Sequence, residues 1–341
     1  MDLISKFALG EGVLEISLYG GGHINATYLV ATDGGKYILQ KINRFVFKDP
    51  ADVMENIVKV TEHLRGKADV LSMVPCKDGA MWHVANDGDY WRMYDFVENT
   101  VCKEITDDPD IFAESGRAFG EFIDLMADFD PKKLAETIPH FHDTPRRYNA
   151  LAEAIKADPM GRVRLVRPEI NFAMARRGFA DVLMNLQQSG QMPIRVVHND
   201  AKLSNVLFCA KTMRAKCVID LDTVMPGLAV TDFGDGIRFG ASTAAEDEKN
   251  PDKVEFSLPL YMAYRRGFLS GCKSLTPLEA AHLPHGAKMM TLENGIRFLT
   301  DFISGDVYYK IQRDGQNLDR CRTHFKLVRS MEEQLPEVAF V

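Results

Sequence analysis

The sequence predicts an α+β fold of two unequal lobes, with a small β-rich lobe over residues 1–97 and a larger, mostly helical lobe over residues 98–341. Short β-type runs interrupted by glycines dominate the first part of the chain, and apolar residues at helical spacing dominate the second. A chain of 341 residues also exceeds the length that one hydrophobic core usually organises. A ligand cleft between the lobes is therefore the default site.

The N-terminal lobe is expected to be a mostly antiparallel sheet that carries one main helix. Strands are expected in the segments 13–22, 26–35, 36–43, 70–84 and 90–97. A helix is expected in 49–67, where the residues at helical spacing are Val53, Ile57, Val60 and Leu64. Asp49 and Pro50 form a typical helix start.

Helix is expected over most of the chain after Val101. The first such helix has an apolar face formed by Phe112, Gly116, Phe119, Ile123 and Met126. Short strands are expected only in 194–197, 205–210 and 215–220, and further helices in 232–240, 260–268, 286–303 and 320–333. A β-rich lobe followed by a helical lobe is the order of the bilobal protein-kinase-like fold, with a short hinge expected at 95–99.

Composition excludes several classes of function. A formal net charge of −7 without a long basic block gives little driving force for nucleic-acid binding. No window offers about 18 uninterrupted apolar residues, and no leader-like segment opens the chain, so we expect a cytoplasmic protein that does not span a membrane. Six scattered cysteines show no zinc-binding spacing and are expected to be buried free thiols.

The segment HNDAKLSN, residues 198–205, carries a candidate catalytic set between two expected strands. Asp200 has the position of a base near a substrate hydroxyl, Lys202 can reach a transferring phosphoryl group, and Asn205 can hold a metal ion. This order reproduces the H-x-D-x-K-x-x-N pattern of kinase catalytic loops. Each residue alone would more often be a cap or a core residue, but their joint spacing predicts phosphoryl transfer.

A kinase also needs an acidic metal ligand at the end of a following strand. Asp220 follows the apolar run 217–219 and is the predicted magnesium ligand, and Asp222, two residues later on the same face, is a second candidate. The literal DFG at 232–234 follows a Pro-Gly turn and opens a helical segment, so we do not assign the metal to Asp232.

The nucleotide side is predicted from a glycine cluster and from the hinge. Gly20, Gly21 and Gly22 lie between two expected strands, where a backbone without Cβ atoms can approach phosphates. A simple hairpin turn is the alternative interpretation of the same glycines. Asp95 and Val97 in the expected hinge are further candidates for nucleotide contacts.

One position departs from the usual kinase pattern. In KYILQ, Gln40 occupies the place of the strand lysine that pairs with nucleotide phosphates, and Lys36 and Lys41 lie nearby. Either Gln40 contacts phosphate as a neutral donor, or Lys41 or another cation takes over. The helix partner of such a lysine cannot be assigned either, so Glu55 and Glu62 have no predicted role.

With these residues in place, the sequence resembles the aminoglycoside phosphotransferase and choline kinase superfamily and, within it, the bacterial N-acetylhexosamine 1-kinases. The resemblance runs over nearly the whole chain, in blocks such as GGHIN-TYLV, HND-KL-N, IDLDT-MPG and DFGD-IRFGAST-EDE. It implies ATP and Mg²⁺ as cofactors, Asp200 as the base, and Asn205 and Asp220 as metal ligands. It also implies that Asp232 braces the catalytic loop.

The same resemblance implies which residues face a sugar substrate beside Asp200, namely His23, Thr223, Arg297 and Tyr308. Arg297 and Asp301 lie one helical turn apart and could grip hydroxyls or an N-acetyl group together. An i,i+4 surface salt bridge between them is an equal alternative.

These inferences predict an ATP-dependent phosphotransferase that phosphorylates the anomeric hydroxyl of free N-acetylhexosamines. One alternative is a kinase of the same fold for another hydroxyl substrate, such as an amino alcohol, homoserine, methylthioribose or an aminoglycoside. The other is a non-catalytic nucleotide-binding regulator, which the glutamine at position 40 motivates. The expected partners are ATP and a small sugar.

Overall fold

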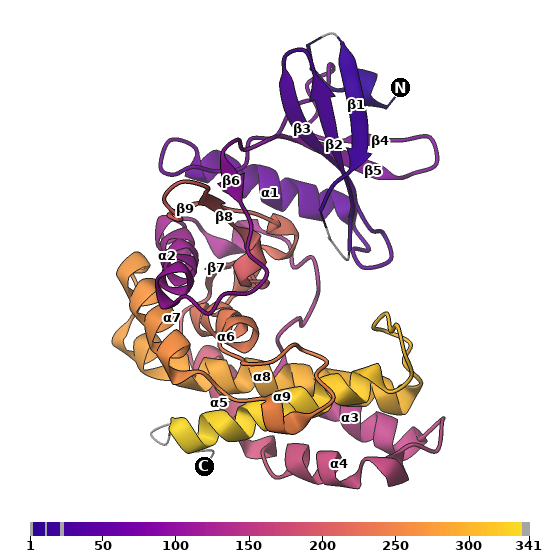
Figure 1. Ribbon diagram of the computed structural model, residues 1–341, viewed down its shortest axis with the longest axis vertical. Helices are drawn as coiled ribbons and strands as arrows, with labels where there is room; N and C mark the ends of the chain where they lie inside the picture. Colours follow the sequence, from indigo (N-terminus) through magenta and orange to yellow (C-terminus); the bar gives the residue numbers. More distant parts are fainter. Residues whose placement is uncertain (1–2, 11, 21–23, 336–341) are drawn as a thin grey trace.

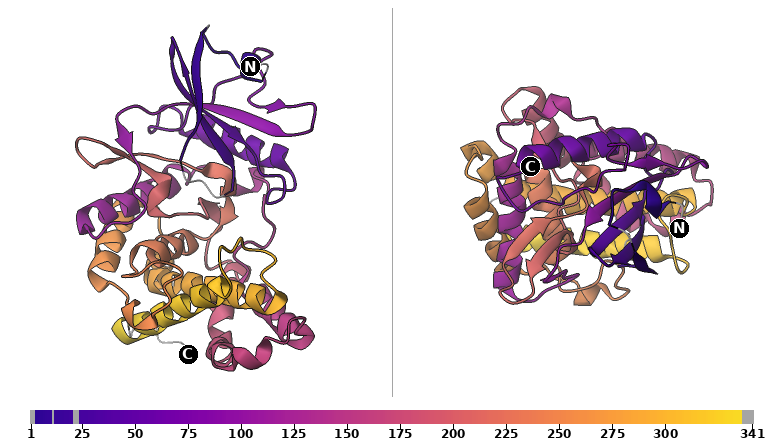
Figure 2. Two further views of the ribbon diagram at one scale, coloured as in Figure 1. Left: turned by 45° about the vertical axis from the view of Figure 1, so that its right-hand side comes forward. Right: turned by 90° about the horizontal axis from the view of Figure 1, so that it is seen from above.

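The computed structural model describes residues 3–10, 12–20 and 24–335. It confirms the predicted α+β fold class: a β-rich N-terminal region lies at one end of the molecule and a larger helical region at the other (Figures 1 and 2). Gly21 and Gly22, predicted to approach the nucleotide, and His23, predicted to face the sugar, lie outside the described residues.

The N-terminal sheet has five antiparallel strands in the order β1-β2-β3-β5-β4. The strands are β1 (Val13–Leu18), β2 (Ala26–Thr32), β3 (Gly35–Lys41), β4 (His83–Val84) and β5 (Tyr90–Asp95). Gln40 in β3 faces Thr27 across β2 and Arg92 across β5. Directly opposed residues share one face of a sheet, so these three side chains are neighbours.

The prediction of a strand over 70–84 is wrong for most of that segment. Only β4 is a strand there, although the backbone of Val74 donates one hydrogen bond to Met93 in β5. Pro75 follows and cannot donate, and a segment without that donor leaves the ladder. The apolar residues that suggested a strand instead fill a small core under the sheet, where Val74 and Cys76 are buried.

Helix α1 (Pro50–Leu64) confirms the helix predicted for 49–67. Its predicted apolar face is buried, comprising Val53, Ile57, Val60 and Leu64. The buried Asn56 amide on the same helix bonds to the following region: Nδ2 donates to the carbonyls of Ala135 and Val224, and Oδ1 accepts from the Ala135 amide. The helix is therefore anchored to the C-terminal region as well as to its own sheet.

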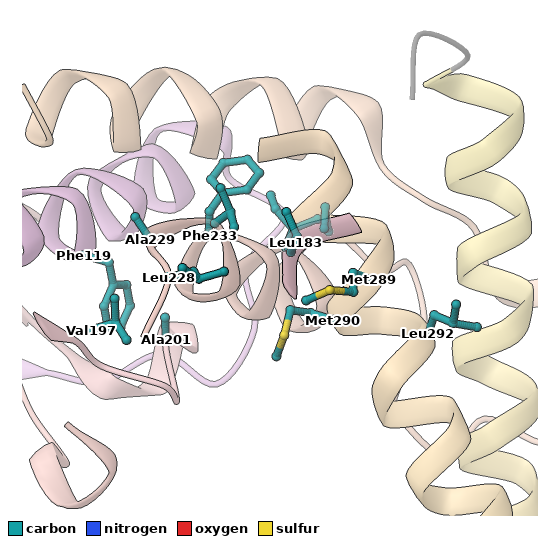
Figure 3. Packing of buried hydrophobic residues seen from close by; sticks show 14 of the residues in the cluster. Phe119, Leu183, Val197, Ala201, Leu228, Ala229, Phe233, Met289, Met290 and Leu292 are labelled. Carbon is teal, nitrogen blue, oxygen red and sulfur yellow. The ribbon is translucent and has the colours of Figure 1, made fainter. Parts of the chain in front are cut away.

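The C-terminal region is mostly helical, as predicted. Its helices are α2 (Pro109–Leu125), α3 (Thr144–Ala157), α4 (Arg167–Met174), α5 (Asp181–Gln188), α6 (Ala229–Gly240), α7 (Leu258–Gly271), α8 (Pro277–Ser304) and α9 (Gln316–Gln334). Helices α6 and α8 approach closely, because a Cβ atom at Gly234 would lie only 2.3 Å from the Gly286 carbonyl oxygen. Phe233 and Met290 fill the core beside this contact (Figure 3). This packing fixes the first turn of α6, which carries Asp232.

Two small sheets hold the loops that carry the predicted catalytic residues. Strand β7 (Arg195–Val197) pairs with β10 (Met225–Gly227), and β8 (Val206–Cys209) lies between β6 (Thr100–Val101) and β9 (Ala215–Val218). The three predicted short strands are thus present. Loop 198–205 runs from β7 to β8 and loop 219–224 from β9 to β10, so the two loops emerge beside one another.

Two further expectations can be compared with the structure. In the described residues, no helix is both long and apolar enough to cross a membrane. All six cysteines are free thiols, as predicted, and four of them are buried. Cys102 is exposed and Cys209 is half-buried, so the expectation of burial is wrong for these two.

Candidate active site

Asp232, in the first turn of α6, holds loop 198–205, which follows β7 and carries the predicted catalytic residues. Its carboxylate accepts the backbone N–H groups of His198 at 2.6 Å and of Asn199 at 2.7 Å. Asn199 has a left-handed backbone with φ 62°, which turns the chain sharply toward Asp200. Complete burial raises the pKa of Asp232 to about 7, against the effect of these two hydrogen bonds. Asp232 therefore shapes the catalytic loop from inside the core.

His198 is a buried core residue that joins the two loops. Its Nδ1 accepts from the Asp200 N–H at 3.3 Å, so the ring proton is on Nε2, which donates to the Ile219 carbonyl at 2.9 Å. The ring packs edge-on against Phe119 and Phe122. Burial lowers the pKa of His198, which keeps the ring neutral. Its role is to hold the end of β9 against the catalytic loop.

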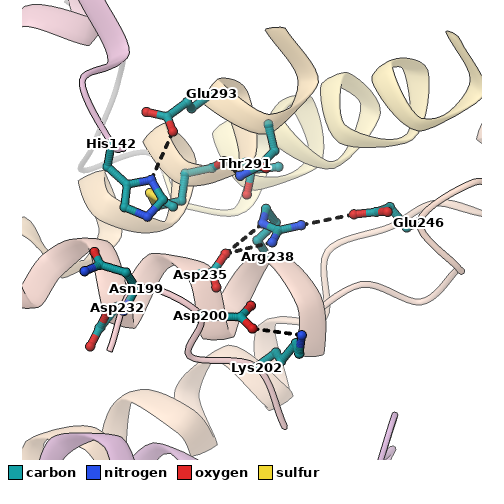
Figure 4. Close-up of polar contacts among 12 residues, drawn as sticks. His142, Asn199, Asp200, Lys202, Asp232, Asp235, Arg238, Glu246, Thr291 and Glu293 are labelled. Atoms are coloured by element: carbon teal, nitrogen blue, oxygen red, sulfur yellow. Dashed lines mark hydrogen bonds and ion pairs between the residues drawn. The ribbon is translucent and has the colours of Figure 1, made fainter. Parts of the chain in front are cut away.

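Asp200 lies between the two other predicted members of its loop. Its Oδ2 accepts from Lys202 Nζ at 2.8 Å (Figure 4). The same oxygen accepts from Asn205 Nδ2 at 2.9 Å, and Asn205 Nδ2 also donates to the Asp200 carbonyl. Burial disfavours the carboxylate, but the Lys202 charge and these hydrogen bonds bring the pKa of Asp200 below its ordinary value. Asp200 is therefore an ionised carboxylate whose second oxygen forms no hydrogen bond within the described residues.

Asp220 stands where β9 ends and has the oxygen chemistry that Mg²⁺ prefers. Its backbone is left-handed with φ 62°. Burial, together with the negative charges of Asp222 and Asp200, raises the pKa of Asp220 to about 7. Within the described chain its carboxylate forms no hydrogen bond or ion pair. A crowded, unpaired carboxylate of this kind is a fitting ligand for a divalent cation.

Asn205 can complete that ligand set. Its Nδ2 is bound to Asp200, which leaves its side-chain oxygen for a cation, and its carbonyl accepts from the Ile219 N–H at 2.9 Å. This last bond ties Asn205 to the residue before Asp220. The described residues contain no group of three or more His, Cys, Asp or Glu that could hold a metal. A site with few protein oxygens suits Mg²⁺, which usually keeps waters and substrate phosphate oxygens as its other ligands.

Asp222, the second metal candidate, is instead paired across the two regions of the molecule. Its Oδ1 lies 2.5 Å from Arg92 Nη1, and its Oδ2 accepts from Asn25 Nδ2 at 2.5 Å. Both partners belong to the N-terminal region, Arg92 in β5 and Asn25 just before β2. Asp222 therefore joins loop 219–224 to the N-terminal sheet.

Three of the described residues predicted for the nucleotide lie around the segment that joins the two regions, where Tyr19, next to Gly20, packs edge-on against Phe96. Gly20 is exposed, has φ 72° and has open space where a Cβ would be, as expected of a turn. The Asp95 N–H bonds to the Ser72 carbonyl at 2.9 Å, and the Val97 carbonyl accepts from Thr100 Oγ1 at 2.7 Å. These residues are placed near the junction, and their contact with a nucleotide stays a prediction.

Thr223, predicted to face the sugar, is bound to the catalytic loop. Its hydroxyl donates to the His198 carbonyl at 2.7 Å, and its own carbonyl accepts from Asn199 Nδ2 at 3.0 Å. The residue is also buried. In this arrangement Thr223 supports the loop that carries Asp200, and a direct sugar contact stays a prediction.

Asp301, another predicted sugar residue, organises the loop after α8. Oδ1 accepts from the N–H groups of Val307 and Tyr308, and Oδ2 accepts from the Tyr309 N–H and from Asn317 Nδ2. Over the described chain no ion pair joins Asp301 to Arg297, so the alternative of a surface salt bridge is wrong. Asp301 positions Tyr308, a residue that is 60% exposed.

Arg297 lies in a group of aromatic and basic side chains near that loop. Its guanidinium is 5.6 Å from the ring centroids of both Phe141 and Tyr309. Arg147 is close by: burial and then the charge of Arg297 lower the pKa of Arg147. Of the predicted sugar residues, the structure thus groups Arg297 with Tyr308 and Asp301 and places Thr223 with the catalytic loop.

Comparison with known proteins identifies the family. The sequence profile of the phosphotransferase enzyme family matches residues 15–264, which include loops 198–205 and 219–224. The chain belongs to this family. The prediction of a phosphotransferase is confirmed, and so is the resemblance at the level of the aminoglycoside phosphotransferase and choline kinase superfamily.

Several solved phosphotransferases share the fold over almost their whole length. A microcompartment-associated aminopropanol kinase has a TM-score of 0.61 at 15% identity and covers 100% of this chain and 98% of its own. An aminoglycoside phosphotransferase from Alicyclobacillus acidocaldarius has a TM-score of 0.66 at 12% identity, covering 99% and 96%. An amicoumacin kinase in complex with AMP-PNP and Ca²⁺ has a TM-score of 0.61 at 14% identity, covering 91% and 87%. At these identities the likeness shows the fold alone.

Sequence reasoning missed several side chains at the centre of this phosphotransferase. They are Asn25, Arg92, Asn199, Asp235 and Arg238, of which Asp235 and Arg238 form a buried ion pair at 2.7 Å. One signal was present for Arg92: it is a charged residue inside the apolar strand run YWRMYD. A fully buried arginine requires a buried acidic or carbonyl partner, and a search for that partner would have led to Asp222.

Proposed function

We propose that this phosphotransferase is an ATP- and Mg²⁺-dependent kinase that phosphorylates the anomeric hydroxyl of N-acetylhexosamines. The observation that carries the proposal is the state of Asp200. This carboxylate is ionised and fixed on one oxygen by Lys202 and Asn205, with the other oxygen open. Such a group can orient a hydroxyl and accept its proton as the bond to phosphorus forms.

The residues around Asp200 supply the remaining parts of phosphoryl transfer. Lys202, 30% exposed beside Asp200, can stabilise the transferred group. Asn205 and Asp220 would hold Mg²⁺, which neutralises charge on the phosphates when bound. An anomeric hydroxyl is more acidic than an ordinary alcohol, so Asp200 needs little basicity and a lowered pKa is no obstacle. Positioning of the hydroxyl should account for most of the rate.

ATP as the donor is supported by the likeness to nucleotide complexes. Among similar solved structures, an amicoumacin kinase is in complex with AMP-PNP and a spectinomycin phosphotransferase with ADP. In this chain Tyr19, next to Gly20, packs edge-on against Phe96, in the segment that joins the two regions, and a junction of this kind is the default position of a ligand cleft. We assign the nucleotide to this junction.

The charges near the proposed acceptor side favour a neutral sugar over a cationic acceptor. Glu293 is completely buried and accepts from His142 (Figure 4). Its other oxygen accepts from the Thr144 hydroxyl, so both oxygens are hydrogen-bonded within the protein. Arg147 and Arg297 lie beside the tyrosines of loop 305–309, and within the described residues neither forms an ion pair with a carboxylate. An amino alcohol or aminoglycoside would meet these arginines at an electrostatic cost, whereas sugar hydroxyls and an acetamido oxygen can accept from them.

A turnover assay with a panel of acceptors tests the proposal. Purified protein, ATP and Mg²⁺ are combined with N-acetylglucosamine, N-acetylgalactosamine, the plain hexoses, the 1-deoxy sugars, choline and 1-aminopropan-2-ol. We expect acceptor-dependent ADP release with the two acetamido sugars and none with the 1-deoxy sugars. Preference for a cationic acceptor would support the alternative kinase, and nucleotide binding without turnover on any acceptor would support the regulator.

A further inference from the structure

The N-terminal sheet lacks a lysine at position 40, and the two nearby lysines are engaged elsewhere. Lys36 Nζ lies 3.3 Å from Glu98, and both side chains are about half exposed. Lys41 forms an ion pair with Asp89 and lies over the Trp91 ring. Strand alternation places Lys41 on the opposite face of β3 from Gln40. Neither lysine is placed to act at loop 219–224.

Arg92 provides a cation on the face that Gln40 shares. The two residues are directly opposed across β3 and β5. Gln40 Oε1 accepts from Arg92 Nε at 3.0 Å and from Nη2 at 2.8 Å, while Gln40 Nε2 donates to Thr27 Oγ1 at 3.1 Å. Arg92 is only 1% exposed. A lysine at position 40 would put a second positive charge against this guanidinium, so a neutral acceptor at position 40 and an arginine at position 92 are a matched pair.

The remaining nitrogen of the Arg92 guanidinium, Nη1, contacts loop 219–224. Arg92 Nη1 lies 2.5 Å from Asp222 Oδ1, and the other oxygen of Asp222 is held by Asn25, whose Oδ1 accepts the Asn43 N–H at 2.9 Å. Asp222 lies two residues after Asp220, in the single helical turn Leu221–Thr223. One buried cation of the N-terminal region thus fixes the turn that follows the proposed metal ligand.

We propose that Arg92, oriented by Gln40, replaces the strand lysine and acts as a positioning residue that holds Asp222 and, with it, the turn presenting Asp220. Protein kinases pair the strand lysine with a helix glutamate. Here the strand cation, Arg92, instead pairs with Asp222 in the C-terminal region. No glutamate of α1 is therefore needed as its partner. Glu55 accordingly pairs with Lys59 on its own helix, and Glu62 is exposed. The inference rests on the proposed function only in taking Asp220 as a metal ligand.

The test measures how much Mg²⁺ strengthens ADP binding, which requires no acceptor. Calorimetry gives the ADP dissociation constant with and without Mg²⁺, and thermal unfolding checks the fold of each variant. In Arg92→Gln we expect the gain in affinity from Mg²⁺ to shrink by about tenfold or more, the usual effect of removing a group that orients a metal ligand. Lys41→Met is the matched control, with a gain within about twofold of the unchanged protein, because Lys41 lies on the other face.

A charge relocation separates this role from general stabilisation. The double variant Gln40→Lys with Arg92→Gln returns the cation to β3. We expect this variant to recover at least about half of the Mg²⁺-dependent increase in ADP affinity that Arg92→Gln loses, measured on a logarithmic scale. If Arg92→Gln does not fold, Arg92→Lys serves, with an expected reduction of about three- to tenfold. The inference is overturned if the Mg²⁺-dependent increase in ADP affinity is unchanged in Arg92→Gln or Arg92→Lys. It is also overturned if this increase is lost in Arg92→Gln and the double variant does not recover it. Failure of the proposed function would appear differently, as absent sugar turnover with intact Mg²⁺-dependent ADP binding.

Discussion

At the scale of single residues, the chemistry depends on how Asp200 is held. Lys202 and Asn205 occupy one carboxylate oxygen and keep the group ionised, while the backbone on either side is fixed by His198 and by Asn205. The carboxylate is needed for transfer more than for folding, because its partners are themselves partly exposed or bonded to the backbone.

Replacing the base should abolish turnover with little effect on the fold. Asp200→Asn keeps the side-chain volume but cannot accept the hydroxyl proton, so we expect kcat to fall by about 100- to 10,000-fold. The affinity for ADP should change by less than about threefold, since the nucleotide gains little from this charge. Steady-state kinetics and calorimetry check both values, and a variant that keeps most of its kcat would refute the base assignment.

The two carboxylates of the site should respond differently to pH. At saturating Mg²⁺, kcat should be level from about pH 8 down to about pH 5, because the lowered pKa of Asp200 keeps it ionised there. At limiting Mg²⁺ the rate should fall as the pH drops through about 7, because protonation of Asp220 then competes with the cation. Rate profiles at two Mg²⁺ concentrations check this; coincident profiles would contradict it.

At the scale of elements, Asp232 in α6 and Asp220 in loop 219–224 have different surroundings, which fit a structural role for Asp232 and the proposed metal-binding role for Asp220. Asp232 is held in the core by the close contact of α6 with α8 and bonds to the catalytic loop. Asp220 stands at the end of β9 with its carboxylate unpaired in the described structure. The literal DFG sequence is therefore a brace in this fold.

Alanine substitutions should separate these two roles. Asp232→Ala leaves two buried N–H groups without an acceptor, so we expect a loss of about 2–5 kcal/mol in the free energy of unfolding. Asp220→Ala should change the thermal midpoint little but raise the Mg²⁺ concentration for half-maximal rate by about tenfold or more. Thermal unfolding and Mg²⁺ titrations distinguish them, and the reverse pattern would make the DFG segment the metal motif.

The loop after α8 should control acceptor binding. Asp301→Ala removes the acceptor of three backbone N–H groups in residues 307–309, which frees Tyr308 from its fixed position. We expect the KM for the sugar to rise by about tenfold while the KM for ATP stays within about twofold. Lys310→Ala, an exposed change on the same loop, is the control. Equal changes in both KM values would show that the loop does not serve the acceptor.

The elements that sequence reasoning predicted are those with strong local signals. Helix α1 follows from its apolar spacing, and loop 198–205 follows from its polar residues between two strands. The strand expected in 70–84 failed because Pro75 interrupts backbone pairing, which apolar content alone does not reveal. Asp222 was read as a spare metal ligand, since its partner Arg92 is 130 positions away and is paired only through the tertiary fold.

At the scale of the whole molecule, a few buried polar contacts join the two regions around the proposed cleft. Arg92 and Asn25 bind Asp222, and Asn56 of α1 bonds to the carbonyls of Ala135 and of Val224 at the end of loop 219–224. Buried contacts of this kind favour one relative placement of the two regions. A nucleotide bound at the proposed junction site would thus meet loop 219–224 in a position that both regions hold.

The central claim, transfer of a phosphoryl group to the anomeric hydroxyl, is tested most directly by phosphorus NMR of the product. The protein is incubated with ATP, Mg²⁺ and N-acetylglucosamine or N-acetylgalactosamine, with Asp200→Asn in parallel. We predict a sugar phosphate whose phosphorus is coupled to H1, formed by the unchanged protein and not by Asp200→Asn. A phosphorus coupled to the H6 protons, or no sugar phosphate from either acetamido sugar, would contradict the claim.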